Sequence, residues 1–182
     1  MRKIIFAINT TINGSADHTV GIADDELHNF YTDLLNNVDV VLMGRKTYQL
    51  MESFWPVVHK EPRSTQSVLR FADKFNSIKK IVFSETLKEV KWQNSQLANQ
   101  NLQEVILKFK NQDGKNMSAG SLSISLQLLN LNLIDEFWIA VHPIIAEKGP
   151  RLFDGMDVNK KLKLIDSKTL SSGVVFHHYQ KL

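Results

Sequence analysis

The chain of 182 residues contains no cysteine. It therefore has neither a disulfide nor a thiolate metal site, and nothing in its composition indicates an oxidising compartment. The HExxH, G-x-S-x-G and Walker signatures are also missing from the sequence. We expect no metal site.

Long hydrophobic runs are missing as well. No stretch approaches the roughly 18 apolar residues of a membrane span. The basic start at Arg2 and Lys3 precedes an apolar run, Ile4–Ile8, that polar residues end at once. This run is too short for a signal peptide. We expect a cytoplasmic protein without a membrane segment.

The net charge of the chain is small. Twenty-two basic and 19 acidic side chains leave a formal charge of +3, and they are dispersed along the chain. Such a balance favours a phosphorylated small molecule over nucleic acid, which needs a clustered basic face. With 43% hydrophobic residues, a chain of this length buries roughly 70% of its unfolded surface. We expect one domain over residues 1–182.

Strand and helix patterns alternate, which is typical of an α/β domain. Asp24 is the expected cap of a helix with one apolar face, made by Leu27, Phe30, Tyr31, Leu34, Leu35 and Val38. A second helix is expected over Ala98–Phe109. Strands are expected over residues 3–10, 38–42, 79–83, 136–142, 162–170 and 174–179.

Two segments are less clear. Residues 121–128 alternate polar and apolar, as in a half-buried strand, yet Leu122, Leu126, Leu129 and Leu133 also have helical spacing. We predict a helix that begins at Gly120-Ser121. Residues 57–77 are the least organised stretch, and we predict a surface excursion there.

The segment Met43–Tyr48 directly follows the apolar run Val38–Leu42, where a strand would lead into a helix. Gly44 permits a tight turn, and Thr47 is a good helix cap. The cations of Arg45 and Lys46, with the positive end of the helix dipole, would hold the phosphates of an extended ligand. The alternative is a solvated basic turn. The first interpretation predicts a dinucleotide site.

Four blocks together resemble the dihydrofolate reductase superfamily, in particular free-standing reductases similar to the C-terminal domain of the bifunctional riboflavin-biosynthesis deaminase/reductase. They are Lys3–Gly14, Met43–Pro56, Lys80–Leu87 and Met117–Phe153. The resemblance implies a three-layer α/β fold with a mixed, mostly parallel sheet, a homodimer and NADPH as cofactor. It implies reduction of a phosphoribosylaminopyrimidine first and of dihydrofolate second. A non-catalytic nucleotide-binding relative is a third possibility.

The resemblance also assigns cofactor-binding residues. Arg45 matches a residue that holds the adenosine 2′-phosphate, while Lys46 and Thr47 match residues that face the pyrophosphate. Ser84 matches a further 2′-phosphate ligand, although a serine at this place could equally begin a turn. Gly44 and the segment Ala119, Gly120, Ser121 and Leu122 complete the expected site.

Three departures from the family pattern stand out. Ala119 replaces the first of two glycines, and a positive φ there would strain it by about 1 kcal/mol or more. Glycines are also common where this chain has Ala146–Gly149, and Asn13 replaces the usual aspartate. An inactive or repurposed relative is therefore a real alternative.

Three acidic residues, Asp24, Asp25 and Glu26, stand at the start of the first predicted helix. By the resemblance, they lie where folate-reducing members of the superfamily keep the carboxylate that binds the pterin-like ring. We predict catalytic roles for Asp25 and Glu26, with Phe30 and Tyr31 flanking a flat substrate one turn on. The alternative is that the acids only cap the helix.

Other polar residues are expected to be structural. His177 and His178 point to opposite faces of one strand and cannot share a metal. His142 reads as a strand end, Trp55 as an aromatic anchor at a helix end, and Asp135-Glu136 as a helix-to-strand turn.

Overall fold

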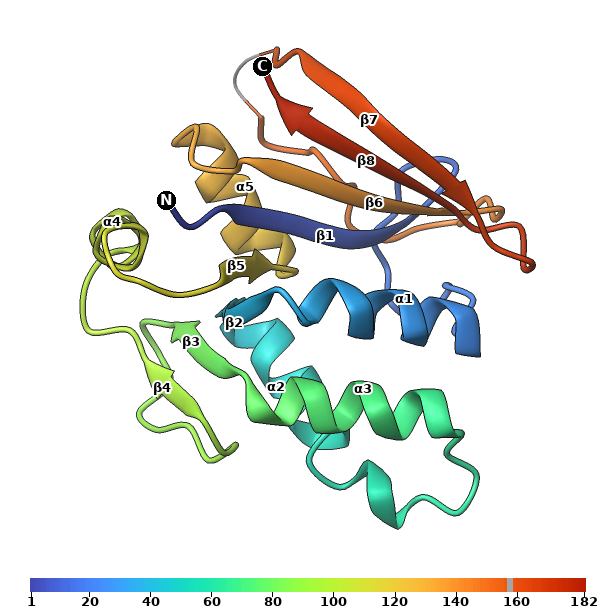
Figure 1. Cartoon of the computed structure of the whole chain (residues 1–182), viewed down its shortest axis with the longest axis horizontal. Coiled ribbons are helices and arrows are strands. Elements are labelled where there is room, and N and C mark those ends of the chain that lie inside the picture. The colour runs from blue at the N-terminus through green and yellow to red at the C-terminus, as the bar shows by residue number, and fades with distance from the viewer. Residues whose placement is uncertain (157–158) are drawn as a thin grey trace.

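The computed structural model describes residues 1–156 and 159–182 (Figure 1). Its strands are β1 (Ile4–Thr11), β2 (Val38–Gly44), β3 (Lys79–Phe83), β4 (Ser95–Leu97), β5 (Asn116–Ala119), β6 (Glu136–His142), β7 (Leu162–Thr169) and β8 (Val175–Lys181). Its helices are α1 (Asp25–Leu35), α2 (Arg45–Phe54), α3 (Gln66–Ser77), α4 (Leu102–Lys110) and α5 (Leu122–Asn130), with a short 3-10 turn, η1 (Val58–Lys60).

All eight strands form one sheet in the order β4-β3-β2-β5-β1-β6-β8-β7. The first six in this order pair in parallel, while β8 runs antiparallel to both β6 and β7. The predicted mixed, mostly parallel sheet is confirmed. The central strands read as apolar runs because helices cover both of their faces.

Successive side chains of β1 point to opposite faces of the sheet, so β1 contributes to the core on both faces. Ile4 and Phe6 pack on the face that α4 and α5 cover. Ile5 and Ala7 pack on the opposite face, together with residues of α1, α2 and α3. Figure 1 shows α1 and α3 side by side on this second face. The sheet is therefore the middle of three layers, as expected.

The two helices that matter for function leave neighbouring strands in opposite directions. Helix α2 leads from β2 outward to β3, whereas α5 leads from β5 across β1 to β6, and the two helices cover opposite faces of the sheet. The carboxyl ends of β2 and β5 thus form a topological switch point. Open α/β sheets bind their ligands at such places.

The prediction of an unorganised excursion over residues 57–77 is wrong. This segment contains η1 and the whole of α3, whose Ala72 and Phe75 are buried in the core. Apolar residues at positions 68, 71, 72 and 75 have helical spacing, so a signal was present. The strands β4 and β5 were not predicted, because segments of three and four residues show no period.

Three predicted boundaries can be checked directly. The helix over residues 122–130 is confirmed. The cap assigned to Thr47 is wrong, because α2 already begins at Arg45 and its N-cap is Gly44. Helix α4 begins at Leu102 behind Asn101, whose side chain accepts from Glu104 N, so Ala98 lies outside it.

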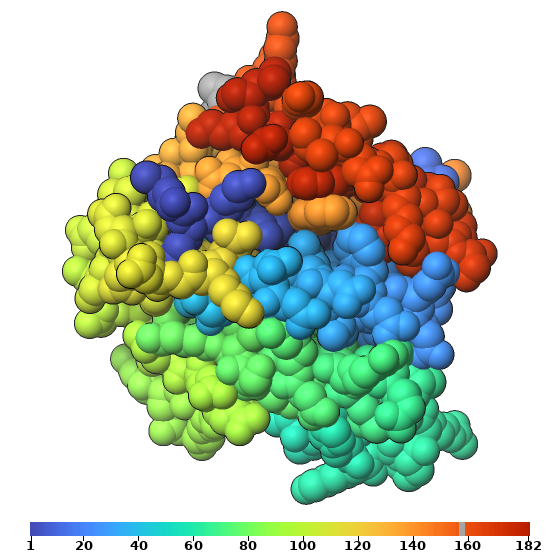
Figure 2. Space-filling model, in the orientation of Figure 1, coloured from blue at the N-terminus to red at the C-terminus, as the bar shows by residue number. Residues whose placement is uncertain are grey.

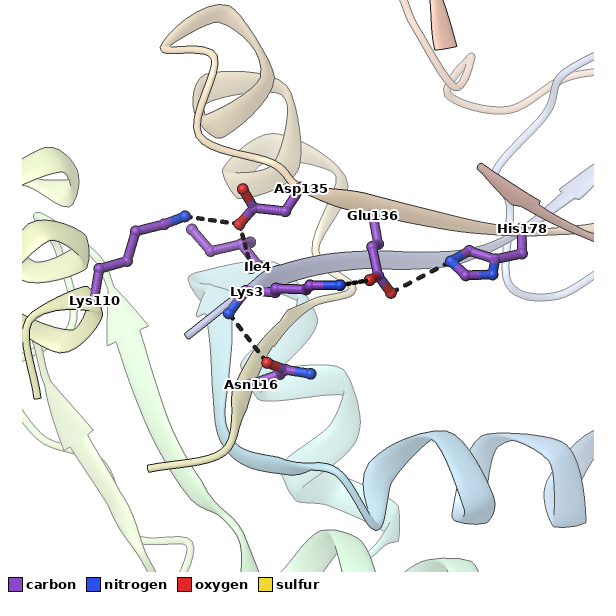
Figure 3. A network of polar contacts seen from close by, with 7 residues as sticks. All are labelled: Lys3, Ile4, Lys110, Asn116, Asp135, Glu136 and His178. Atoms are coloured by element: carbon purple, nitrogen blue, oxygen red, sulfur yellow. Dashed lines mark hydrogen bonds and ion pairs between the residues drawn. The ribbon is translucent and has the colours of Figure 1, made fainter. Parts of the chain in front are cut away.

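The amino ends of β1, β5 and β6 are held together by polar contacts (Figure 3). Asp135 Oδ2 accepts from Ile4 N (2.8 Å) and from Lys110 Nζ (2.7 Å), and Glu136 Oε1 lies 2.5 Å from Lys3 Nζ. Lys3 N donates to Asn116 Oδ1 (3.1 Å). The structural role predicted for Asp135-Glu136 is confirmed.

Two absences follow from the described residues alone. Within them no helix has the length and apolar character that a membrane span requires. Nor do three His, Asp or Glu side chains gather there as metal ligands would.

Candidate functional site

Gly44 is the last residue of β2 and the N-cap of α2, and its backbone lies very close to the start of α5. Its φ is −84°, which any residue can adopt. A Cβ at this position would lie 2.8 Å from Ser123 Oγ and 3.1 Å from Ser121 Oγ. Close approach between the two helix starts, rather than a tight turn, is therefore what requires glycine here.

Ser121 joins the two helices. It is the N-cap of α5 and is almost fully buried, and its Oγ accepts from Gly44 N (3.1 Å) and from Thr47 Oγ1 (3.1 Å). We call this contact of Gly44, Thr47 and Ser121 the α2–α5 junction. It brings together three predicted cofactor residues that are far apart in the sequence.

Neither helix at the junction has a side chain that caps it. The first-turn N–H groups of α2 and α5 thus have no side-chain acceptor, and two positive dipole ends meet at one place. Arg45 and Lys46 lie in the first turn of α2 and are exposed, and neither forms an ion pair with any described residue. This arrangement suits an anion with more than one charge.

The strain that a positive φ would place on Ala119 does not arise. Among the described residues, only Asn94 and Asn132 have positive φ without being glycine. Ala119 ends β5, and its methyl group is buried in the core. The next residue, Gly120, is exposed, and a Cβ there would lie 3.3 Å from the Ala7 carbonyl oxygen. A side chain at position 120 would thus crowd the Ala7 carbonyl oxygen. Leu122 is the first residue of α5, and the cofactor roles of Ala119, Gly120 and Leu122 remain predictions.

Ser84 lies directly after β3 and begins a turn. Its Oγ accepts from Thr86 N (3.2 Å) and Leu87 N (3.0 Å), which supports the turn interpretation. A hydroxyl that accepts these two bonds can still donate its hydrogen. Contact with a 2′-phosphate stays a prediction.

The three acids at the start of α1 have distinct partners. Asp24 caps the helix by accepting from Leu27 N (2.7 Å). Asp25 Oδ1 accepts from Thr65 Oγ1 (2.5 Å) and Ser67 Oγ at the start of α3. Glu26 Oε2 accepts from Ser171 N and Oγ in the β7–β8 turn (2.7 and 2.6 Å).

These bonds determine what Asp25 and Glu26 can do. The hydroxyl of Ser67, followed by that of Thr65, holds the pKa of Asp25 below its usual value. The Ser171 hydroxyl and N–H do the same to the pKa of Glu26. Both carboxylates stay ionised near neutral pH and are poor proton donors. Their contacts support the structural alternative, and their catalytic roles remain predictions.

Phe30 and Tyr31, the two aromatic residues of α1, contact other side chains of the chain. Phe30 stacks on Phe176 with ring centroids 3.6 Å apart. Tyr31 donates its hydroxyl hydrogen to Asn9 Oδ1 (2.8 Å), and burial raises the pKa of Tyr31. Phe176 therefore covers one face of the Phe30 ring, and the substrate-binding roles of Phe30 and Tyr31 remain predictions. No pattern in the sequence singled out Asn9 or Phe176.

Two departures from the family pattern contact each other. Asn13 Nδ2 donates to the Ala146 carbonyl oxygen (2.7 Å), and Ala146 N donates back to Asn13 Oδ1 (3.0 Å). An aspartate could accept but not donate. The asparagine and the altered loop therefore form one matched contact between the β1–α1 and β6–β7 connections.

His142 ends β6 as expected, and it is almost fully buried. Its Nδ1 lies 2.9 Å from Ile22 N, so it accepts that N–H, and the ring proton must sit on Nε2. Nε2 has no hydrogen-bond partner among the described residues. Desolvation lowers the pKa of His142, and Asp24 opposes this only in part.

The remaining predictions on polar and aromatic residues agree with the structure. His178 stacks on Trp138 at 3.9 Å, while His177 Nδ1 lies 3.1 Å from Ser167 Oγ, so the two rings have separate surroundings. Trp55 is the C-cap of α2 and packs on Phe71 with centroids 4.6 Å apart.

The chain is similar to proteins of one family over nearly its whole length. A family model described as the RibD C-terminal domain matches residues 2–176. The uncharacterized protein YyaP of Bacillus subtilis (strain 168) is 32% identical over 180 residues, which cover 96% of this chain and 92% of that protein.

Solved structures share the fold. A putative riboflavin biosynthesis protein from Shewanella sp. PV-4 has a TM-score of 0.75 and 20% identity, covering 100% of this chain and 99% of that chain. The diaminohydroxyphosphoribosylaminopyrimidine deaminase/5-amino-6-(5-phosphoribosylamino)uracil reductase of Thermotoga maritima has a TM-score of 0.67 and 18% identity. This chain is covered completely in that alignment, but only 57% of the other chain is. The predicted fold class is confirmed.

Proposed function

Because the chain belongs to the RibD C-terminal domain family, a family of reductases that use NAD(P)H, we propose that it is an NADPH-dependent reductase of a small heteroaromatic or ribosylaminopyrimidine substrate. The observation that carries the proposal is the α2–α5 junction. Two uncapped helix starts and two exposed cations meet there at the switch point of the sheet.

The residues of the junction fit a dinucleotide diphosphate. Lys46, Thr47 and the first-turn N–H groups of α2 and α5 would hold the diphosphate, and exposed Gly120 leaves room for close approach. Arg45, with Ser84 at the end of β3, would hold a 2′-phosphate. When bound, this cofactor would supply the hydride, and the chain would orient it and exclude water.

Reduction of a phosphoribosylaminopyrimidine is the first specific proposal. It is supported by the similar structures from Shewanella and Thermotoga, whose names refer to riboflavin biosynthesis and to this reductase activity. Dihydrofolate reduction is second, and a homodimer is proposed from the family alone. A nucleotide-binding relative without turnover is the rival, although Ala119, which first suggested it, is unstrained.

Titration with NADPH, followed by its fluorescence, tests the site. Arg45→Ala should weaken binding about tenfold, since one charge-assisted contact of about 1.4 kcal/mol is lost. Arg63→Ala removes another exposed arginine and is the matched control. If Arg45→Ala binds as tightly as the unaltered chain, Arg45 is not part of the site.

Turnover needs a separate assay. The protein, NADPH and either the pyrimidine or dihydrofolate should together lose the absorbance of the reduced nicotinamide. Binding of NADPH without oxidation by any candidate substrate would contradict the enzymatic proposal and favour the regulatory rival.

A further inference from the structure

A hollow lies at the amino ends of the central strands, whereas the α2–α5 junction lies at their carboxyl ends. It has a volume of about 300 Å³ and is lined by Ile5, Leu34, Asn37, Lys115, Asn116, Glu136 and Trp138. These residues come from the starts of β1, β5 and β6 and from the end of α1. Figure 2 shows this face, where α1 (light blue) meets the start of the chain (dark blue), the segment before β5 (yellow) and β6 (orange). We call the hollow lined by these seven residues the amino-edge pocket.

Part of the wall of the amino-edge pocket is apolar. Ile5 and Leu34 supply aliphatic surface from the sheet and from α1. The indole of Trp138 stacks on His178 with centroids 3.9 Å apart and planes within 10°. A wall of this kind suits a flat apolar body of modest size.

The single carboxylate in the wall is already balanced by positive charge. Glu136 Oε1 lies 2.5 Å from Lys3 Nζ, and its Oε2 lies 3.3 Å from His178 Nε2. Figure 3 shows these three side chains in one row. The hydrogen bond and the charge of Glu136 raise the pKa of Lys3, so Lys3 stays charged near neutral pH. The charge of Glu136 is therefore balanced by that of Lys3.

Donors, in contrast, remain available. Asn116 uses its oxygen to accept from Lys3 N, which leaves its NH2 group free of any partner among the described residues. Lys115 Nζ donates once, to the Asn36 carbonyl oxygen (2.8 Å), and is exposed. An ammonium group has three hydrogens to donate. The Asn37 side chain bonds to no other described residue and adds a further amide.

The pocket therefore has an apolar part in Ile5, Leu34 and Trp138 and spare donors beside it. Lys115, Glu136 and the Lys3 that pairs with Glu136 give a formal excess of one positive charge. We propose that the amino-edge pocket binds a small monocarboxylate with a flat apolar body, of the benzoate type. The ring lies against Trp138 and Leu34, and the carboxylate accepts from Lys115 and from the amides of Asn37 and Asn116. This site is independent of the α2–α5 junction and of the proposed reductase activity.

Binding can be followed through the indole N–H signal of Trp138 in a nitrogen–proton NMR spectrum. The chain has three tryptophans, so comparison with Trp138→Phe assigns the signal. Benzoate should shift this signal saturably and leave those of Trp55 and Trp92 in place. Benzamide, which has the same shape without the charge, should bind about tenfold more weakly.

Two variants localise the effect. Lys115→Gln should weaken benzoate binding about tenfold. Lys108→Gln changes a different exposed lysine, which lies on α4, and should leave benzoate binding unchanged. Arg45→Ala should bind benzoate normally, which separates this site from the cofactor site. A shift that does not saturate, or equal binding by Lys115→Gln, would overturn the proposal. So would concentration-dependent broadening of the Trp138 signal without benzoate, which would show that a second copy of the chain covers the pocket.

Discussion

The backbone N–H of Gly44 donates to the hydroxyl oxygen of Ser121 across 3.1 Å and 77 positions of sequence. This one bond joins the end of β2 to the start of α5 and thereby sets two helix N-termini against each other. The Thr47 hydroxyl donates to the same oxygen. Loss of Ser121 would therefore disturb both halves of the proposed diphosphate site at once.

Ser121→Ala should weaken NADPH binding about tenfold and lower the free energy of unfolding by about 1–3 kcal/mol, because a buried N–H loses its acceptor. Fluorescence titration and urea unfolding measure the two effects. Thr47→Val should also weaken NADPH binding, because Thr47 would itself contact the diphosphate. In urea unfolding, however, the double variant should resemble Ser121→Ala alone, since both changes remove one shared hydrogen bond. Additive losses of stability in the double variant would show that Thr47 stabilises the fold independently of Ser121.

Gly44→Ala should destabilise the fold, because its methyl group would lie 2.8 Å from Ser123 Oγ and 3.1 Å from Ser121 Oγ. Overpacking of this kind typically costs about 1–3 kcal/mol. Ser123 is exposed, so Ser123→Ala alone should be nearly neutral. In the Gly44→Ala background the same change should recover part of the lost stability in urea unfolding. No recovery would mean that the contact with Ser121 Oγ, and not that with Ser123 Oγ, limits the space at Gly44.

The sequence predicted well those elements whose own side chains determine them. The helix capped by Asp24 and the strand over residues 79–83 form as expected, because periodicity and burial agree within each segment. Val38 fits both the apolar face of that helix and the strand predicted over residues 38–42, and it begins β2, since tertiary packing decides where a periodic pattern ends. Strand β5 could not be predicted, because its four residues form a strand only through pairing with β1 and β2.

The site shows the same limit. Gly44, Arg45 and Ser121 could be named from local patterns and from the family resemblance. Their mutual contact could not, because it depends on the order of strands in the sheet. The partners of Asp25 and Glu26 were also hidden, since Ser67 and Ser171 are distant in sequence and carry no signal of their own.

His142 should make stability depend on pH. Desolvation lowers its pKa from the ordinary value of 6.5, so the folded chain keeps the ring neutral at a pH where the unfolded chain already binds a proton. The contribution to stability is therefore present above pH 6.5 and is lost as the pH falls below it. Protonation would also place a hydrogen on Nδ1, which must accept from Ile22 N.

Urea unfolding from pH 7.5 down to 5 measures this dependence. His142→Gln should show a smaller loss of stability over that range than the unaltered chain. His18→Gln, a change of an exposed histidine, serves as the control and should retain the full dependence. Equal slopes for the unaltered chain and His142→Gln would assign the effect to other groups.

Asn13→Asp should destabilise the chain even though it restores the residue that the family usually has. The Asn13 NH2 group donates to the Ala146 carbonyl oxygen at 2.7 Å, and a carboxylate would place a charge against that oxygen instead. We expect a loss of about 1–3 kcal/mol in the free energy of unfolding, as for a part-buried acceptor left without its donor. Asn99→Asp, at an exposed position, introduces the same charge elsewhere and should be nearly neutral. If both variants unfold at the same urea concentration as the unaltered chain, the contact with Ala146 does not stabilise the fold.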